Sequence, residues 1–348
     1  MNVTDSETRR NKILELVIEA YVSTASPVGS ELVARKLRSS LSSATIRNIM
    51  VELEQAGLLE QPHTSAGRVP TDRGYRFYVD SVMDVRRVPA EELHRIEALI
   101  RLPEFEVDQV MERASAALAD LTQEAAFAVA PTVKRHTVKQ IELVPLSVRK
   151  VLCVLVANDE LIASHVVEII EPMNRDEAAA LARFINTELA GLSFVELLAS
   201  LERRMLAESD SFYHLVKRSL DILQHALSIE PDERLFFEGA SHLVSQPEFS
   251  RDPRKAHELL RGLDAEEAFL SRVRQDIPAS GVRVRIGREM QLPGLEECSS
   301  LTAPVAIGGD VIGGIGILGP KRMDYPRMRA LVEGTARCVT ALLTHENL

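Results

Sequence analysis

Residues 42–71 constrain the fold of this chain more than any other segment, because they combine a short amphipathic helix with a tight hairpin. They read SSATIRNIMVELEQAGLLEQPHTSAGRVPT. Four apolar side chains recur at helical spacing and predict one packing face: Ile46, Ile49, Met50 and Leu53. Gly57 is typical of the residue that ends a helix. Residues 58–59 then begin a strand, residues 62–67 turn, and Val69 leads back.

Two further helices are predicted upstream of this segment. The first carries four side chains on one face: Ile13, Val17, Ala20 and Tyr21. Residues 26–30 break it, and Ser30 is a good N-cap for a second helix that runs to Leu37. Three helices followed by a small hairpin are typical of a winged helix-turn-helix unit, whose third helix enters the major groove of DNA. The alternative is an ordinary three-helix packing unit.

The exposed side of the third helix favours DNA binding over plain packing. Its first turns present small and polar residues, namely Ser43, Ala44, Thr45, Arg47 and Asn48. Arg pairs with guanine, Asn pairs with adenine, and Ala or the Thr methyl group contacts the methyl group of thymine. Recognition helices read bases with their N-terminal residues. We therefore expect these five residues to contact bases.

The hairpin tip adds candidates for contacts with DNA phosphates, which are His63, Thr64, Ser65 and Arg68. Hydroxyl and guanidinium groups are common phosphate ligands, and Gly67 would permit a close approach of the backbone to DNA. His63 is equally consistent with a solvated surface side chain.

Charge is distributed unevenly along the chain. The formal net charge is −10, which at first argues against nucleic acid. Residues 1–87, however, hold 12 Lys and Arg against 11 Asp and Glu, and residues 35–76 hold 7 against 4. Phosphate binding can therefore be local, while the acidic remainder keeps the protein soluble and repels DNA.

A fourth helix is predicted from residues 70–71, with Tyr75, Tyr78, Val79 and Val82 on one face. This face either packs on the first helices or contributes to a dimer contact. Pro89 marks a linker to the rest of the chain.

The remainder is predicted to be α+β, because strand-like runs occur in two blocks with helices around them. The runs are 137–146, 151–156 and 161–170, and later 282–286, 301–307 and 311–318. Asn174 and Glu177 resemble a capping box at the start of a helix. This pattern suggests one domain interrupted by a mainly helical insertion. The expected boundaries are 1–88, 89–190, 191–278 and 279–348.

The insertion contains a strong apolar stripe at helical spacing, and it offers the largest spare apolar surface for assembly. We expect a dimer contact through Phe212, Val216, Leu220 and Leu223. A core helix and an interface helix have the same pattern, so ordinary core packing remains the alternative.

Motifs for catalysis and metal binding are missing from the sequence. The Gly-rich block GGDVIGGIGILGP (308–320) lacks the Lys-Ser/Thr ending of a phosphate loop and favours a hairpin with close strand packing. No histidine or cysteine spacing fits a zinc site. Cys153, Cys298 and Cys338 are expected as buried free thiols of a reducing cytoplasm, and no apolar run is long enough to span a membrane. We expect no catalytic residue, no metal and no cofactor.

Residues 32–78, and above all TIRNIMVELEQAGLLEQPHTSAGRVPTDRGYRFYVD (45–80), resemble the bacterial heat-inducible transcription repressor family HrcA. The chain length, the strand-rich centre and the Gly-rich block 308–320 are also similar to that family. The resemblance implies a cytoplasmic, dimeric repressor of chaperone operons that binds an inverted-repeat operator in double-stranded DNA. It also implies that the interrupted domain is GAF-like, that the insertion dimerises, and that the chaperonin GroEL keeps the repressor active.

Two other functions compete with this expectation. The first is a winged-helix regulator controlled by a small effector bound in its GAF-like domain. The second is an enzyme that carries its own DNA-binding module, which the missing catalytic motifs disfavour.

Overall fold

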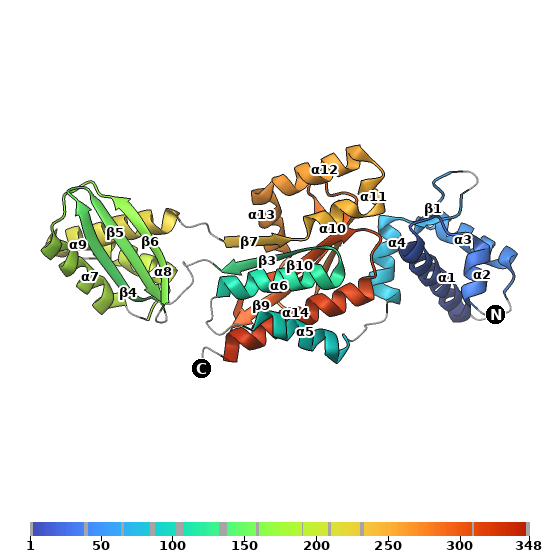
Figure 1. The fold of residues 1–348 in the computed structure, drawn as a ribbon, viewed down its shortest axis with the longest axis horizontal. Helices are drawn as coiled ribbons and strands as arrows, with labels where there is room; N and C mark the ends of the chain where they lie inside the picture. The colour runs from blue at the N-terminus through green and yellow to red at the C-terminus, as the bar shows by residue number, and fades with distance from the viewer. Residues whose placement is uncertain are drawn as a thin grey trace. The chain divides into compact units, whose positions relative to one another are not determined.

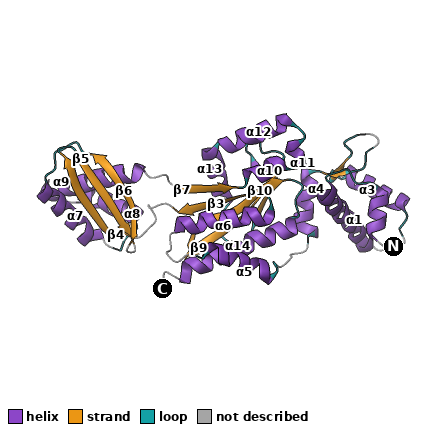
Figure 2. Cartoon of the chain, viewed as in Figure 1, coloured by secondary structure: helices purple, strands orange, loops and turns teal. Residues whose placement is uncertain are grey.

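The chain forms two compact units in the computed structural model (Figure 1). One contains residues 1–130 together with 235–348, and the other contains residues 131–234. Both units combine helices and strands, which confirms the α+β class (Figure 2). The structure describes residues 3–37, 41–63, 66–83, 88–101, 107–131, 138–157, 160–189, 191–207, 210–229, 233–307 and 310–345.

The first unit begins with helices and a short β-ladder, as expected. These elements are α1 (Val3–Thr24), α2 (Ser30–Leu37), α3 (Ser43–Gln55), β1 (Leu59–Glu60), β2 (Val69–Pro70) and α4 (Asp72–Phe77), followed by a π-helical turn (Tyr78–Val82). The strands β1 and β2 are antiparallel. The predicted apolar faces are largely confirmed, because Ile13, Val17 and Ala20 of α1 and Ile46, Met50 and Leu53 of α3 are buried.

A five-stranded sheet forms the body of the same unit, in the order β7-β3-β10-β9-β8. Its strands are β3 (Ala125–Pro131), β7 (Glu233–Glu238), β8 (Arg283–Ile286), β9 (Cys298–Ile307) and β10 (Asp310–Pro320). Its helices are α5 (Ala90–Ile100), α6 (Val107–Thr122), α10 (Ala240–Ser245), α11 (Pro247–Ser250), α12 (Pro253–Asp264), α13 (Glu266–Asp276) and α14 (Tyr325–His345), with a 3-10 turn at Gly287–Met290.

Side chains of β3 alternate between the two faces of this sheet, as the two-residue period of a strand requires. Ala126 and Ala128 belong to a core shared with α6 and α14. Phe127 belongs to a second core shared with α10 to α13, where its ring meets Phe269 at a centroid distance of 5.5 Å. Helices therefore cover both faces. Residues 310–320 of the Gly-rich block pair with β9, which confirms the expected antiparallel pairing with close strand packing.

The second unit is a separate three-stranded antiparallel sheet with helices on one face. It contains β4 (Val138–Ser147), β5 (Lys150–Ala157), β6 (Glu160–Glu168), α7 (Arg175–Leu189), α8 (Phe194–Ala207) and α9 (Asp210–Ile229). The predicted capping box begins α7: the Glu177 amide donates to Asn174 Oδ1 at 2.9 Å, and the Asn174 amide donates to Glu177 Oε2 at 3.1 Å.

The structure corrects the expected boundaries of the interruption. The strand runs at 138–168 do not join the later strands in one sheet, and the interrupting unit is 131–234 rather than 191–278. The reason is the pairing of β3 with β7, which brings the two ends of the interruption together in the sheet of the body. The helices between 240 and 276 consequently cover that sheet, whereas the interrupting unit has three strands of its own.

The cysteines are free, as expected, and Cys153 and Cys298 are buried while Cys338 is partly exposed. Burial raises the pKa of the Cys153 thiol to about 12, so this group stays protonated at neutral pH.

Candidate nucleic-acid interface

The N-terminal half of α3 presents a polar face next to an apolar one. Ala44, Thr45, Arg47 and Asn48 are exposed, and Ser43 is half-buried. The buried residues of the same helix anchor it in the core. The structure thus places all five residues that were predicted to contact bases in the first two turns of α3, with four of them exposed.

Hydroxyl groups fix the start of α3. Ser42 is the N-cap, and its Oγ accepts a hydrogen bond from the Thr45 amide at 3.1 Å. The Thr45 hydroxyl lies 2.9 Å from the same Oγ, and the Ser43 and Ser30 hydroxyls are 3.0 Å apart. Ser43 therefore ties α3 to the start of α2, and its hydroxyl is less free to meet a base than a fully exposed one.

Arg47 and Asn48 are the best-placed polar groups for binding a ligand. Both are exposed, and neither makes a hydrogen bond or ion pair with any residue that the structure describes. Arg47 also lines an open hollow of about 270 Å³. The other lining residues come from the α1–α2 turn, from α3 and from the hairpin: Val28, Gly29, Ser30, Met50, Gln61, Ala66, Gly67 and Arg68.

Arg68 is held inside the unit rather than extended from the hairpin. Its Nε and Nη2 atoms donate to Glu54 Oε2 at 3.0 and 2.9 Å, and its side chain is only 15% exposed. Its backbone pairs with Val28, with N–H to O=C distances of 2.9 Å in both directions. Sequence reasoning missed Glu54 because the residue lies 14 positions before Arg68 and looks like an ordinary solvated helix position.

Gly67 permits a close approach, but to another part of the protein. A Cβ atom at this position would lie 2.4 Å from the carbonyl oxygen of Val28. The structure therefore gives a different reason for a glycine at position 67 than room for DNA: it lets the hairpin pair with the α1–α2 turn.

The hairpin tip is described only in part. His63 is exposed, and its carbonyl accepts a hydrogen bond from the Ala66 amide at 2.8 Å. The Gln61 side chain donates to the Ala66 carbonyl at 3.0 Å and braces the turn. Thr64 and Ser65, which were predicted to contact phosphates, lie outside the described residues.

The predicted dimerisation residues do not form a spare surface. Val216, Leu220 and Leu223 are buried in the core that α9 shares with the three-stranded sheet, and the Phe212 side chain lies outside the described residues. The apolar stripe is wide because α9 packs on its own sheet. The expectation that these three side chains contact a second chain is therefore corrected: they belong to the core of their own unit.

The outer face of this sheet carries an apolar row between charged residues instead. Val144 pairs with Leu152, which pairs with Val166, so that three apolar side chains form one row across the strands. Val144 and Val166 are 44% and 49% exposed. Other exposed apolar residues of the unit are Leu146, Val148 and Ile170.

Two features were sought and not found. Among the described residues, no group of His, Cys, Asp and Glu side chains is arranged to hold a metal ion. Within the same residues, no helix is both long and apolar enough to cross a membrane.

Comparisons with known proteins agree over nearly the whole chain. Residues 108–328 match the model of the HrcA protein C-terminal domain. The chain is 35% identical over 337 residues to the heat-inducible transcription repressor HrcA of Moorella thermoacetica, covering 97% of this chain and 96% of the relative. The repressor of the same name from Geobacter sulfurreducens is 33% identical over 344 residues, covering 99% and 100%.

A solved structure has the same fold. It is a crystal structure, at 2.2 Å resolution, of a protein described only as hypothetical. Its TM-score is 0.64 at 24% identity, and the match covers 97% of this chain and 98% of that one.

Proposed function

Since the chain belongs to the HrcA family of heat-inducible transcription repressors, we propose that it represses transcription by binding double-stranded DNA through α3 and the following hairpin. The observation that carries this proposal is the exposed N-terminal face of α3, with Arg47 and Asn48 free to accept partners. The protein has no catalytic role in this proposal.

The N-terminal part of the first unit acts as a winged helix-turn-helix module. The N-terminal half of α3 enters the major groove, where Arg47 and Asn48 read base edges and Ala44 and Thr45 contact thymine methyl groups. Ser43 lies at the same end of the helix and positions it through its hydroxyl contact with Ser30.

The β1–β2 hairpin acts as the wing and contacts the DNA backbone. His63, Thr64 and Ser65 are its proposed phosphate ligands. Arg68 keeps one terminal nitrogen, Nη1, for a phosphate while Glu54 binds the other two. The pairing of Arg68 with Val28 supports a wing that is fixed relative to α3.

The five-stranded sheet with helices on both faces acts as the GAF-like domain that the family resemblance implies. In this proposal, its sequence is interrupted by the 131–234 unit, and that unit dimerises.

A homodimer on an inverted repeat explains how a small module reads enough base pairs to be selective. The exposed apolar row Val144, Leu152 and Val166 supports a contact between the outer sheet faces of two copies, because apolar patches of this kind are typical of interfaces.

The regulation proposed here follows the family. Binding to chaperone operons is relieved by heat stress, and the chaperonin GroEL maintains the active repressor in the cytoplasm. Repression measured from a chaperone promoter, with and without added chaperonin, tests this part: an unchanged operator occupancy after chaperonin removal would contradict it.

One experiment tests the proposed function directly. Purified protein is incubated with a pool of random duplexes, and the bound fraction is sequenced over successive rounds. We expect an inverted repeat to emerge and to be footprinted in the chaperone promoters of the source genome. Enrichment of no sequence, with binding to all duplexes equally, would remove sequence-specific repression.

A further inference from the structure

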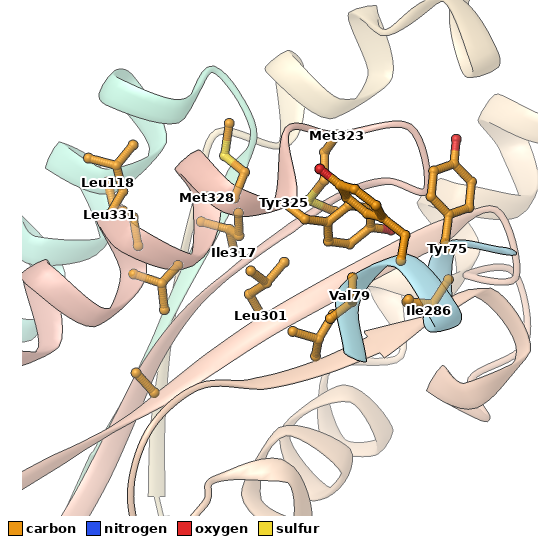
Figure 3. Packing of buried hydrophobic residues seen from close by; sticks show 14 of the residues in the cluster. Tyr75, Val79, Leu118, Ile286, Leu301, Ile317, Met323, Tyr325, Met328 and Leu331 are labelled. Carbon is orange, nitrogen blue, oxygen red and sulfur yellow. The ribbon is translucent and has the colours of Figure 1, made fainter. Parts of the chain in front are cut away.

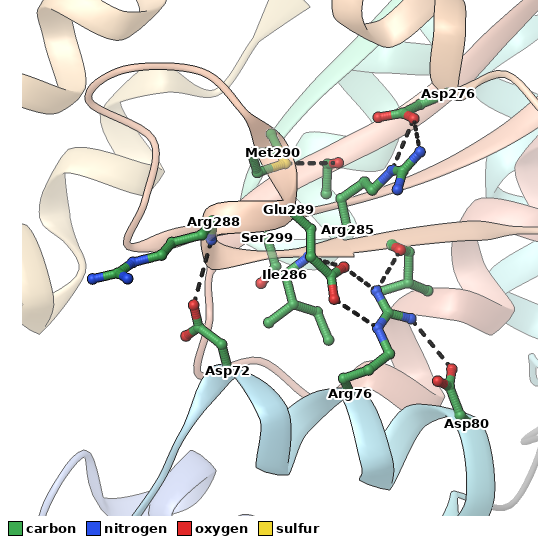
Figure 4. Close-up of polar contacts among 12 residues, drawn as sticks. Asp72, Arg76, Asp80, Asp276, Arg285, Ile286, Arg288, Glu289, Met290 and Ser299 are labelled. Carbon is green, nitrogen blue, oxygen red and sulfur yellow. Dashed lines mark hydrogen bonds and ion pairs between the residues drawn. The ribbon is translucent and has the colours of Figure 1, made fainter. Parts of the chain in front are cut away.

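The DNA-binding module is docked on the body of its own unit by three cationic side chains. The first is Arg76 of α4, whose Nε donates to Glu289 Oε1 at 2.9 Å (Figure 4). Its Nη2 donates to the carbonyl oxygen of Val284 at 2.7 Å, and a second contact joins it to Glu289 Oε2. Arg76 is therefore bound by both a side chain and the backbone at the β8 edge of the sheet.

The second docking contact lies at the other end of α4. Lys321 Nζ is 2.9 Å from Asp72 Oδ1 and 3.4 Å from Glu297 Oε2. Burial lowers the Lys321 pKa, but the hydrogen bonds and charges of Asp72 and Glu297 outweigh burial and raise it. Lys321 therefore stays charged at neutral pH.

The approach of Asp72 to the body is close. A Cβ atom on Gly287 would lie 2.2 Å from Asp72 Oδ2, and Gly287 has a left-handed φ of +54°. A larger residue here would displace the Asp72 carboxylate, and the left-handed backbone favours glycine. The backbone at the start of the 3-10 turn is thus built to receive α4.

The third contact reaches α1. Arg322 Nη1 donates to the carbonyl oxygen of Val22 at 2.7 Å, while its other nitrogens bind Glu248 and Gln246. Glu248 and Gln246 in turn belong to the segment α10–α11 of the body. The last turn of α1 is therefore bound to the body through one guanidinium group.

Aromatic packing lies beneath these polar contacts. The rings of Tyr75 and Tyr325 are 5.7 Å apart, and both side chains are buried (Figure 3). Val79 and Ile286 belong to the same core. Tyrosine packing holds the module near the body, whereas the charged contacts have directional geometry and determine its orientation.

The Arg76 and Lys321 ion pairs are partly exposed, and pairs of this kind contribute little to stability. The three docking contacts nevertheless point in different directions, because Arg76 and Lys321 bind at opposite ends of α4 while Arg322 binds at the end of α1. Three such contacts restrict rotation about any single axis. An orienting role therefore fits them better than a stabilising one.

We propose that Arg76, Lys321 and Arg322 are positioning residues that fix the direction of α3 on the body of its own unit and so limit the half-site spacings that a dimer can bind. This inference rests on the proposed DNA binding by a homodimer. A DNA-binding module that moved freely on a flexible linker would allow the dimer to bind half-sites at many spacings. A docked module allows only the spacings that match its orientation.

The first experiment needs no DNA. Spin labels are placed at the exposed positions Glu60 and Arg254 in a chain carrying Cys338→Ser, and labelled chains are diluted with unlabelled ones. The parent is expected to give one narrow distance distribution. The triple variant Asp72→Asn, Glu289→Gln, Arg322→Met, which also removes the contact with the Val22 carbonyl, is expected to give a clearly broader one. Glu15→Gln, which removes an exposed pair with Lys12 within α1, is the matched control and keeps the narrow distribution.

The second experiment uses the selected inverted repeat and the same duplex with its spacer lengthened by half a helical turn, about five base pairs. The parent is expected to bind the altered duplex at least ~10-fold more weakly, and the triple variant within ~3-fold of its affinity for the original. Circular dichroism and sedimentation confirm that each variant is folded and has the parent's assembly state.

The outcomes of these experiments distinguish the positioning role from the proposed function. Equal distance distributions, or equal spacer discrimination by parent and triple variant, would overturn the positioning role. A parent with a narrow distribution that selects no DNA sequence would instead overturn the proposed function and leave the docking result standing.

Discussion

Exposure and pairing decide what each charged residue can do. Arg47 and Arg68 both line the open hollow beside α3, yet Arg47 is exposed with no partner among the described residues, whereas Arg68 is mostly buried against Glu54. A free guanidinium can pair bidentately with a base, and a bound one cannot do so without leaving its carboxylate.

Arg47→Ala is expected to weaken binding to the selected operator by about 1–3 kcal/mol and to relax preference at one base pair. Affinities for the operator and its single-base variants measure this effect. Gln55→Ala, at an exposed position in the last turn of α3, is the control and should be neutral. Equal loss on operator and random duplexes would make Arg47 a phosphate ligand.

Glu124 is a second residue whose surroundings determine its behaviour. Burial raises the pKa of its carboxyl group to about 8. The negative charge of Glu248 adds to this increase, and the positive charge of Arg322 opposes it. The folded state therefore retains a proton between pH 4.5 and 8 that the unfolded state releases. The native protein loses stability as pH rises through this window.

Glu124→Gln should abolish that loss. We expect the variant to exceed the parent by roughly 2–5 kcal/mol at pH 8 and to match it near pH 5, since each pKa unit is worth about 1.4 kcal/mol. Urea unfolding between pH 5 and pH 8.5 provides the measurement. A parent whose stability is flat over this range would show that Glu124 titrates normally.

The β1–β2 hairpin is an element whose position depends on residues outside it. Val28 pairs with the backbone of Arg68, and Glu54 binds its side chain, so hydrogen bonds join the hairpin to the α1–α2 turn and to α3. Neither partner is close to Arg68 in sequence.

A comparison of two substitutions separates positioning from phosphate binding. Arg68→Ala should lower affinity for all duplexes and reduce the salt slope by about one, because it removes a cation at the backbone. Glu54→Gln keeps the Arg68 cation but removes the carboxylate that holds it in place. Affinity for DNA should therefore fall, while the slope of affinity against salt concentration stays unchanged. Titrations at several salt concentrations test both, and an unchanged slope in Arg68→Ala would remove its phosphate contact.

At the scale of the molecule, the interrupting unit has one face covered by its own helices and one apolar face uncovered. Substitutions on the two faces should have different consequences. The uncovered face is available to a second copy, whereas the covered face supports folding.

Val144→Asp with Val166→Asp is expected to give folded monomers that keep weak, salt-sensitive DNA binding and lose operator selectivity. Leu220→Asp with Leu223→Asp is expected to unfold the interrupting unit, because charges are buried in its core. Analytical ultracentrifugation and circular dichroism distinguish these outcomes. Gln140→Lys, on the same strand outside the apolar row, is the control, because a cation there can still pair with Glu142. Dimers in the first variant would place the contact elsewhere.

The sequence by itself determined several of the elements and the polar residues at the start of α3. Helical spacing predicted α3, local capping predicted the start of α7, and the glycine-rich block predicted the β9–β10 hairpin. These features depend on residues within a few positions of one another, so their physical causes are visible in a short segment.

Only the tertiary structure decided how the strands are divided between the two larger sheets, which apolar helix face belongs to a core, and which residues Arg68 binds. Strands at 125–131 and 233–238 pair across the interruption, so the sheet boundaries could not follow from the order of strand-like runs. Apolar periodicity is the same for a helix that packs on its own sheet and for one that meets another chain. Contacts between residues far apart in sequence depend on the global chain path, and local patterns carry no record of that path.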